Sequence, residues 1–321
     1  MSTERTTSNY FQLALVDHDE TSNSDEQIVQ MFLATCCRNV NTRRNYERAI
    51  IAFRKFISNA ALKDVTWREI EAYKIFLIQG GNSYPKQFAP ASIAAFIAPL
   101  KSFYKWGSDQ HIAFFNKNPT ASVRIPTITI TSRRNFLTKR EVGDLLRELH
   151  KQSLRNYLIG LTLVMLGLRV SELTAMKWGD FHTDPLETSI WLTIANAKGG
   201  KRREIKVPAI LWELYSQLSN SLAENGDPDR ELLMFPLSSR QVERIIKNAG
   251  EFSFIEKKLT PHWLRHTNAT LALLQGASLQ QVQENLGHSH INTTQRYLHT
   301  VQQIQKAAPD FVEDSLRAFI E

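Results

Sequence analysis

Several separated segments of the chain carry side chains suited to binding and transferring a phosphate group. Arg169 lies in a turn between two predicted helices, and Glu172 can hydrogen-bond its guanidinium and hold it as a fork for phosphate oxygens. A later helix places His262, Arg265 and His266 on one face. Cationic and proton-carrying groups that share a face favour the binding and protonation of a phosphate.

Three further residues add a nucleophile and proton donors to this set. His288 comes directly after a predicted helix end at Gly287, and Tyr297 lies on a short helix that Asn292 is expected to cap. Lys198 lies in a predicted β-hairpin. A tyrosine hydroxyl can attack phosphorus to form a covalent intermediate, and a lysine can protonate a leaving group.

Each piece alone also has a simpler interpretation. Arg169 and Glu172 can form a structural ion pair, and Tyr297 can be a half-buried core residue. His262 and His266 have the i, i+4 spacing of a zinc motif, but the intervening glutamate of that motif is missing and no third ligand follows. We therefore expect no metal site. The complete set, in one order along the chain, is what favours phosphate chemistry.

These side chains must be positioned mainly by helices. Capping boxes predict three helix starts, at Ser24, Thr66 and Thr138. Apolar stripes with helical spacing predict further helices around residues 46–57 and 93–104. Residues 157–166 are apolar nearly all round, which is typical of a buried helix, and Gly167 should end it. Ser171 is expected to cap the helix that follows.

A small sheet interrupts the helices. Apolar residues alternate at 190–194 and again at 205–207, and Gly199-Gly200 lies between the two runs. This pattern predicts a β-hairpin with a tight turn. The predicted fold class is therefore mainly α with a small β-sheet.

The length of 321 residues favours two domains. We expect a mobile tail at 1–23, a helical domain at 24–118, a linker rich in Pro, Thr, Ser and Arg at 119–135, a second domain at 136–305 and a C-terminal helix at 306–321. The last segment has an apolar stripe that includes Val312, Leu316 and Phe319.

Composition and charge narrow the class of protein. The net charge is +7, and residues 1–30 hold one basic and six acidic residues, so the remainder of the chain is markedly basic. A basic surface suits a polyanion such as DNA. The longest apolar run, residues 157–168, is 12 residues long, short of the ~20 needed to cross a bilayer. We also find no secretory signal, and Cys36 and Cys37 offer neither a disulfide framework nor a zinc site.

Taken together, these motifs resemble those of the tyrosine recombinase or phage integrase family, of the Xer-like kind. The resemblance covers about residues 25–305. It rests on G-L-R-x-S-E-L at 167–173, K-G-G-K-R-R-E-x-K-V-P at 198–208, P-H-x-L-R-H at 261–266, and L-G-H-S followed by T-T-x-x-Y at 286–297. It implies a helical, SAM-like core-binding domain followed by a catalytic domain.

The resemblance also implies roles for these residues. Tyr297 would attack a DNA phosphodiester and form a 3′-phosphotyrosyl bond, with no metal or other cofactor. Arg169 and Arg265 would clamp the non-bridging oxygens, and His288 would donate a third hydrogen bond. Lys198 would protonate the departing 5′-oxygen with His262 as its partner, and the neighbouring Lys201 is the alternative acid.

Other residues are expected in support or in contact with DNA. Glu172 and His266 are the supporting residues. Basic side chains of both domains are candidate contacts to DNA phosphates, namely Arg43, Arg44, Lys101, Arg133, Arg134, Lys201, Arg202 and Arg203. The basic hairpin face can alternatively be merely solvated. The C-terminal helix either packs on its own domain or, as the resemblance implies, docks on a neighbouring protomer.

The sequence thus predicts a site-specific recombinase that acts on double-stranded DNA in the cytoplasm, at the nucleoid, as a tetramer on two sites. The alternatives are a catalytically silent DNA-binding regulator of the same fold and a relaxing enzyme like the type IB topoisomerases. The intact set of six catalytic candidates argues against the silent regulator. The target sequence, the choice among integration, excision, inversion and dimer resolution, and the need for a DNA-bending protein or a second recombinase stay open.

Overall fold

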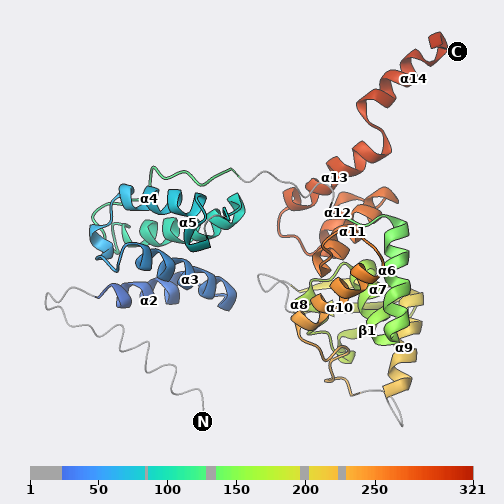
Figure 1. Cartoon of the computed structure of the whole chain (residues 1–321). Coiled ribbons are helices and arrows are strands. Elements are labelled where there is room, and N and C mark those ends of the chain that lie inside the picture. The colour runs from blue at the N-terminus through green and yellow to red at the C-terminus, as the bar shows by residue number, and fades with distance from the viewer. Residues whose placement is uncertain (1–23, 84–85, 128–134, 196–201, 223–228, 321) are drawn as a thin grey trace. The chain divides into compact units, whose positions relative to one another are not determined.

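The computed structural model describes residues 24–83, 86–127, 135–195, 202–222 and 229–320. The chain divides into two compact units, residues 1–129 and 130–321, each with its own core (Figure 1). The expected tail at 1–23 lies outside the described residues. No helix in the described ranges combines the length and apolar character needed to cross a membrane.

The first unit is helical. Its elements are α2 (Asp25–Cys36), α3 (Val40–Phe56), the 3₁₀ turns η1 (Leu62–Asp64) and η2 (Gly81–Ser83), α4 (Trp67–Ile78) and α5 (Pro90–Gly107). The predicted capping boxes at Ser24 and Thr66 start α2 and α4. Aromatic rings fill the core, where Phe32 and Phe103 meet edge to face with their centroids 5.3 Å apart.

Residues that follow α5 pack onto the first unit. The Lys101 ammonium donates to the carbonyl oxygens of Thr120 at 3.1 Å and Val123 at 2.5 Å. The Val123 side chain is buried in the same core. The first residues of the expected linker therefore belong structurally to the helical unit, and residues 128–134 of that linker lie outside the described residues.

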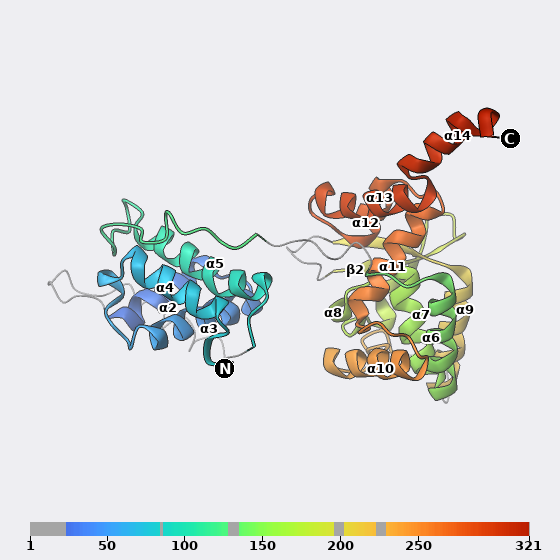
Figure 2. The ribbon, with the colours of Figure 1, turned by 45° about the horizontal axis from the view of Figure 1, so that its top comes forward.

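The second unit combines helices with one small sheet, as Figure 2 shows from another side. Its elements are α6 (Lys139–Gln152), α7 (Leu154–Leu166), α8 (Val170–Leu173), the 3₁₀ turn η4 (Trp178–Asp180), β1 (Phe181–Thr183), β2 (Ile190–Ile194), β3 (Arg203–Val207), α9 (Ala209–Leu222), α10 (Ser239–Phe252), α11 (Pro261–Leu274), α12 (Leu279–Leu286), α13 (Ile291–Gln305) and α14 (Ala308–Ile320). The predicted fold class, mainly α with a small sheet, is confirmed.

The sheet is antiparallel with the order β1-β2-β3. Strands β2 and β3 pair as predicted, and Ile194 lies opposite Arg203 at the end of the pair that adjoins the connecting segment. Strand β1 was not predicted, because three residues are too few to show an alternation of apolar and polar side chains. The inward face of the sheet, with Leu192 and Ile205, joins the core around α7.

Helices α11, α12 and α13 form a smaller apolar cluster of their own. Ala269, Leu273, Val282, Leu286 and Val301 are its buried members, and Tyr297 packs against it. This cluster holds the three helices that carry the C-terminal candidate residues. It therefore decides where Arg265, His288 and Tyr297 can meet.

Candidate active site

The turn between α7 and α8 fixes the backbone of Arg169. Gly167 caps α7 with a φ of +63°, a left-handed conformation that suits glycine. A Cβ at Gly167 would lie 2.6 Å from the Asn268 side-chain oxygen, so the position also has no room for a larger residue. The predicted cap Ser171 is wrong: helix α8 begins with Arg169 as its N-cap, whose backbone N–H donates to Glu172 Oε2 at 2.8 Å.

Glu172 is a buried carboxylate shared by two arginines. Arg169 Nη1 donates to Oε1 at 2.6 Å, and Arg203 donates through Nη1 to Oε1 at 2.9 Å and through Nη2 to Oε2 at 2.8 Å. Burial alone would raise the pKa of Glu172, but the hydrogen bonds and charges of these arginines outweigh burial and lower that pKa to about 2. The carboxylate is therefore ionised at any working pH.

Three arginines converge on the C-terminal end of α12. Arg203 Nε donates to the Asn285 carbonyl at 2.9 Å, Arg265 Nη2 to the Leu286 carbonyl at 2.5 Å, and Arg169 Nη2 to the Gly287 carbonyl at 3.2 Å. The last carbonyls of a helix lack partners within the helix and carry its negative dipole end. This helix end and Glu172 together offset the repulsion among three clustered cations.

Arg265 supplies a buried positive charge at the centre of the site. Its side chain is 2% exposed and also donates through Nη1 to the Gly167 carbonyl at 2.6 Å. Burial and the charge of Arg169 lower the pKa of Arg265 to about 10, which leaves the guanidinium protonated at neutral pH. One side chain thus ties the turn before α8 to the end of α12.

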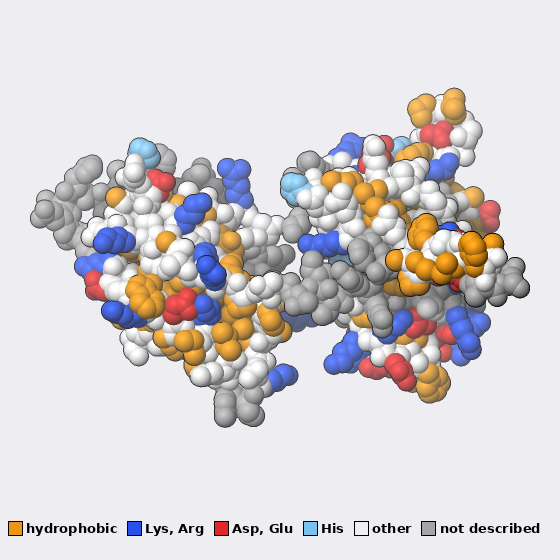
Figure 3. Space-filling model, turned by 90° about the horizontal axis from the view of Figure 1, so that it is seen from above, with side chains coloured by type: hydrophobic (Ala, Val, Ile, Leu, Met, Phe, Trp, Pro, Cys, Tyr) orange, Lys and Arg blue, Asp and Glu red, His pale blue; other side chains and the backbone are white. Residues whose placement is uncertain are grey.

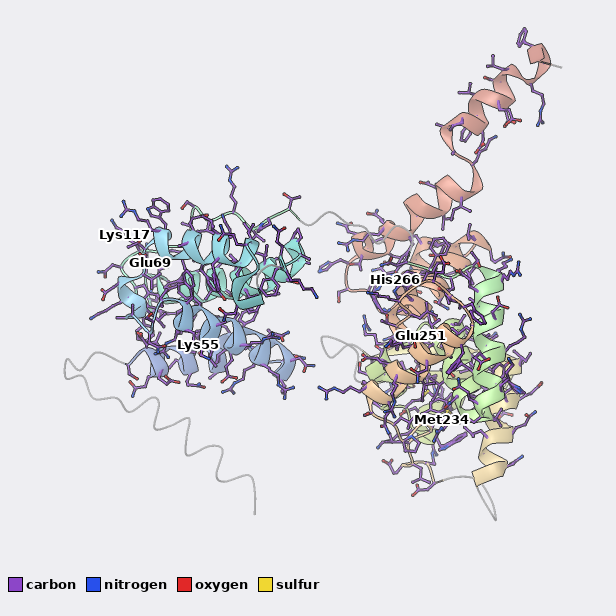
Figure 4. The ribbon with its side chains drawn as sticks, viewed as in Figure 1. Lys55, Glu69, Lys117, Met234, Glu251 and His266 are labelled. Atoms are coloured by element: carbon purple, nitrogen blue, oxygen red, sulfur yellow. The ribbon has the colours of Figure 1, made fainter. Side chains whose placement is uncertain are left out.

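The Tyr297 hydroxyl is hydrogen-bonded to His266 on the neighbouring helix. Tyr297 Oη lies 2.6 Å from His266 Nδ1, and Figure 4 labels His266 on α11, which packs against α13. Burial raises the pKa of Tyr297, an effect that the positive charge of Arg265 partly offsets. The resting phenol is therefore protonated and lies within hydrogen-bond distance of the imidazole.

His288 lies against the same tyrosine. Its ring stacks parallel to that of Tyr297 with the centroids 6.4 Å apart, and its Nδ1 lies 2.9 Å from Thr294 Oγ1. Burial and nearby arginines lower the pKa of His288 to about 4. The predicted cap Asn292 is wrong, because α13 begins at Ile291 with His290 as its N-cap, two residues earlier.

His262 completes the group on α11. Its ring centroid lies 4.2 Å from that of His266. Burial, followed by the charges of Arg265 and Arg169, lowers the pKa of His262. Five of the six catalytic candidates and both supporting residues are thus brought together. The sixth, Lys198, lies outside the described residues, as does its alternative Lys201.

The expected DNA contacts have different surroundings. Arg44 and Arg202 are exposed, Arg43 donates to the Gln30 side chain at 3.3 Å, and Lys101 is bound to backbone carbonyls of its own unit. Arg133 and Arg134 lie outside the described residues. On the face shown in Figure 3, Lys and Arg side chains occur on both units.

Arg203 points inward rather than toward solvent. Its side chain is 9% exposed and bound to Glu172. Sequence reasoning placed it among the DNA contacts and missed its place in the site. The signal was present, because in a strand Arg203 must share a face with Ile205 and Val207, whose side chains are buried.

A cavity of about 570 Å³ opens beside His288. Arg203, the first residue of β3, and the preceding Arg202 line it together with two carboxylates, those of Glu204 and Glu284. Its walls are therefore polar and of mixed charge. The cavity borders both His288 and, through Arg203, the arginine cluster.

Comparisons with known proteins show which family the chain resembles. The sequence profile of the phage integrase family matches residues 135–303. A tyrosine recombinase of Pseudothermotoga lettingae is 29% identical over 278 residues, which are 82% of this chain and 91% of the relative. Tyrosine recombinase XerA of Pyrococcus furiosus is 33% identical over 219 residues, 66% of this chain and 71% of the relative.

Solved structures share the fold. Lambda integrase, as a dimer bound to a COC′ core site and as a tetramer bound to a Holliday junction, aligns with a TM-score of 0.66 at 21% identity, covering 92% of this chain and 85% of that chain. The residue pattern, the convergence of its members and the profile match lead to one conclusion: the chain belongs to the phage integrase family and is a tyrosine site-specific recombinase.

Proposed function

We propose that the chain exchanges DNA strands with Tyr297 as its nucleophile. The observation that carries this proposal is the 2.6 Å hydrogen bond from the Tyr297 hydroxyl to His266, on the same helix as the buried Arg265. It places a phenol beside a cluster of guanidinium groups although 31 residues separate the two bonded side chains. A tyrosine with a purely structural role in the core would not require a histidine and buried arginines as neighbours.

The bond changes are those of two phosphoryl transfers. The Tyr297 oxygen attacks the phosphorus, the bond from phosphorus to the 5′-oxygen breaks, and the strand stays attached as a 3′-phosphotyrosine. A 5′-hydroxyl of the partner strand then attacks the phosphotyrosine and restores the phenol. The bond energy is conserved, so the reaction needs no nucleotide or metal.

Arg169, Arg265 and His288 stabilise the charge on the non-bridging oxygens in the transition state. The Arg169 side chain is 26% exposed and offers the accessible edge of the cluster. Arg265 is 2% exposed, so DNA can reach it only after neighbouring side chains move. The carbonyl partners of both arginines hold the guanidinium groups in place before DNA arrives, which reduces the reorganisation needed.

Protons move at two positions. His266 is the acceptor at hand for the phenol proton, since its Nδ1 lies 2.6 Å from the Tyr297 hydroxyl and its lowered pKa leaves the ring neutral. Lys198 donates a proton to the departing 5′-oxygen with His262 beside it, and Lys201 is the alternative donor. The test replaces each lysine separately and uses a DNA substrate with a 5′-sulfur leaving group, which needs no acid. The lysine whose variant is slow on normal DNA and regains its cleavage rate on this substrate is the proton donor.

We further propose that the protein acts on nucleoid DNA as a tetramer assembled on two sites. In the fold it shares, lambda integrase forms a tetramer bound to a Holliday junction. Helix α14 is a candidate assembly element, because it presents Phe311, Val312, Leu316 and Phe319 to solvent. Such an apolar stripe suits a groove on a second copy of this chain.

The test of the nucleophile is Tyr297→Phe. The variant keeps the ring that packs on the α11–α13 cluster and loses the oxygen, so it should bind DNA as the wild type does and form no covalent adduct. The measurement is the yield of protein-linked DNA on a nicked suicide substrate, resolved under denaturing conditions, with excess EDTA present.

Tyr215→Phe is the matched control, because it removes from α9 a buried phenol that bonds Thr162 at 2.6 Å and lies outside the candidate site. It should form the adduct. A covalent adduct with Tyr297→Phe would move the nucleophile elsewhere. Loss of wild-type activity in EDTA would contradict the proposed chemistry, and a wild type that binds DNA without any adduct would favour a silent regulator.

A further inference from the structure

Every nitrogen of the Arg203 guanidinium donates a hydrogen bond inside the protein. Two of these bonds go to the carboxylate of Glu172 and one to the Asn285 carbonyl, at 2.8–2.9 Å. A bidentate pair of this kind has a fixed geometry. Two of the five N–H donors of the group remain, but the side chain is 9% exposed and its orientation is set by the carboxylate, which disfavours a contact to a DNA phosphate.

The neighbouring Arg202 makes a clear contrast. Its side chain is 69% exposed, and its partners within the described residues are distant, the Thr193 hydroxyl at 3.4 Å and the Glu204 carboxylate at 3.8 Å. Arg202 directly precedes β3, whereas Arg203 is the first residue of that strand and is bound to Glu172. Arg202 is thus suited to a phosphate, and Arg203 to a contact within the site.

Glu172 is the link between Arg203 and Arg169. The carboxylate accepts from both guanidinium groups and from the Arg169 backbone N–H, so its orientation sets the orientation of Arg169. Arg203 holds that carboxylate from the side of β3 and holds α12 through the Asn285 carbonyl. Three elements, β3, α8 and α12, are joined at one side chain.

We infer that Arg203 is a positioning residue for strand cleavage: it locks Glu172, and through it Arg169, against the end of α12, and it does not bind DNA phosphate. The inference rests on the proposed function, because it concerns the same site. It also assigns the first residue of β3, directly after the segment with Lys198 and Lys201, to the arginine cluster.

Close packing around Arg203 supports this role. Gly287, the C-cap of α12, has a φ of +63°, and a Cβ there would lie 2.9 Å from both Cδ and Nη1 of Arg203. The guanidinium thus fills the space that a side chain at position 287 would need. A residue held this tightly has one geometry rather than many.

The experiment separates DNA binding from the cleavage step. We compare Arg203→Gln with Arg202→Gln in the full chain, measuring affinity for a nicked duplex over a range of salt concentrations and the rate of adduct formation at saturating DNA. For Arg203→Gln we expect wild-type affinity and salt dependence, with a saturating rate about 10²-fold lower, the loss that a misplacement of about 1 Å can cause.

Arg202→Gln, in contrast, should change the affinity for DNA. Removal of one phosphate contact weakens DNA binding and lowers the slope of log affinity against log salt by about 0.9. Arg147→Gln, an equal loss of charge at an exposed position on α6, should leave affinity and rate unchanged. The inference is overturned if Arg203→Gln shows the behaviour expected of Arg202→Gln.

Further variants guard against a simple loss of folding. Arg203→Lys keeps the charge but cannot bridge both oxygens of Glu172, so it should restore less than the full rate; a wild-type rate with lysine would contradict the inference. Glu172→Gln should also slow the saturating step, and the double variant should be no slower than the worse single variant. All rates are measured well below each variant's melting temperature.

The outcomes distinguish this inference from the proposed function. If the wild type forms no adduct, the proposed function fails. If the wild type forms the adduct and Arg203→Gln changes only affinity, the proposed function stands and the inference alone fails.

Discussion

Two histidines of the site are held in their neutral form. Burial, together with the charges of neighbouring groups, lowers the pKa values of His266 and His288 to about 4. His266 can therefore accept the Tyr297 proton at neutral pH. The arginines, rather than the imidazoles, supply the positive charge of the resting site.

The lowered pKa values predict a loss of stability in mild acid. An unfolded histidine takes up a proton near pH 6.5, whereas these folded histidines do so only near pH 4. The unfolded state binds more protons in that window, so the free energy of unfolding should rise as pH rises from 4 to 6.5 and then level off. Urea denaturation at a series of pH values measures this dependence.

His288→Gln should weaken the dependence between pH 5 and 6.5, a range above the titration of Glu172. His111→Gln, at an exposed position in the first unit, is the control and should leave it unchanged. An unchanged dependence in His288→Gln would show that the imidazole is not held neutral.

At the scale of single residues, the sequence named the candidate catalytic residues and the pairing of Arg169 with Glu172, but not their other partners. Arg169, Glu172, Arg265 and Tyr297 could be named because their types and order form a pattern. The hydrogen bonds of the three arginines to consecutive carbonyls at the end of α12 depend on tertiary packing, which leaves no signal in the local sequence. The hydrogen bond between Tyr297 and His266 likewise depends on tertiary packing and leaves no signal in the local sequence.

Among the elements, the starts of helices were predictable where the N-cap is a residue type that favours that position. At Ser24, Thr66 and Thr138 a serine or threonine is followed three residues later by Gln or Glu, so the sequence alone predicts the helix start. Helix α8 has the same three-residue spacing between Arg169 and Glu172, but arginine is not a residue type preferred at the N-cap, so the sequence gives no such signal there. The predicted cap Ser171 was therefore wrong.

The end of α12 offers a test of how one element carries the cluster. Gly287→Ala forces a side chain into a left-handed conformation, which costs about 1–2 kcal/mol, and it also displaces Arg203. We expect lower stability and a saturating cleavage rate at least about tenfold lower, as expected when a bound group moves by a fraction of an ångström. Chemical denaturation and the adduct assay measure the two effects.

Gly276→Ala is the matched control for backbone strain. Gly276 has a φ of +92°, and a Cβ there meets nothing within 4 Å. It should lose stability and keep its cleavage rate at temperatures where the protein is folded. Equal rates in the two variants would show that the contact between Gly287 and Arg203 has no part in cleavage.

At the scale of the whole molecule, the exposed stripe of α14 predicts cooperative assembly. Phe319 is 85% exposed, and Phe319→Ser removes the apolar contact that we propose for a second copy. Binding to a single half-site should be unchanged, whereas the second half-site of a full site should fill at least about tenfold less readily, the equivalent of 1.4 kcal/mol. Titrations of both DNAs by gel mobility shift measure the difference.

Leu186→Ser is the control, because Leu186 is an equally isolated apolar side chain, 81% exposed, in the same unit. Leu186→Ser should bind both half-sites of a full site with wild-type affinity. If Phe319→Ser also binds the second half-site with wild-type affinity, α14 has no part in assembly.

The short helix α12 couples the nucleophile to the arginine cluster. Its last carbonyls hold the arginines, and only four residues separate it from α13, which bears Tyr297. Any displacement of α13 that is passed on to α12 must shift the nucleophile and the arginines together. We therefore expect attack and charge stabilisation to be gained or lost as one unit, so that a half-assembled site does not nick a strand that it cannot reseal.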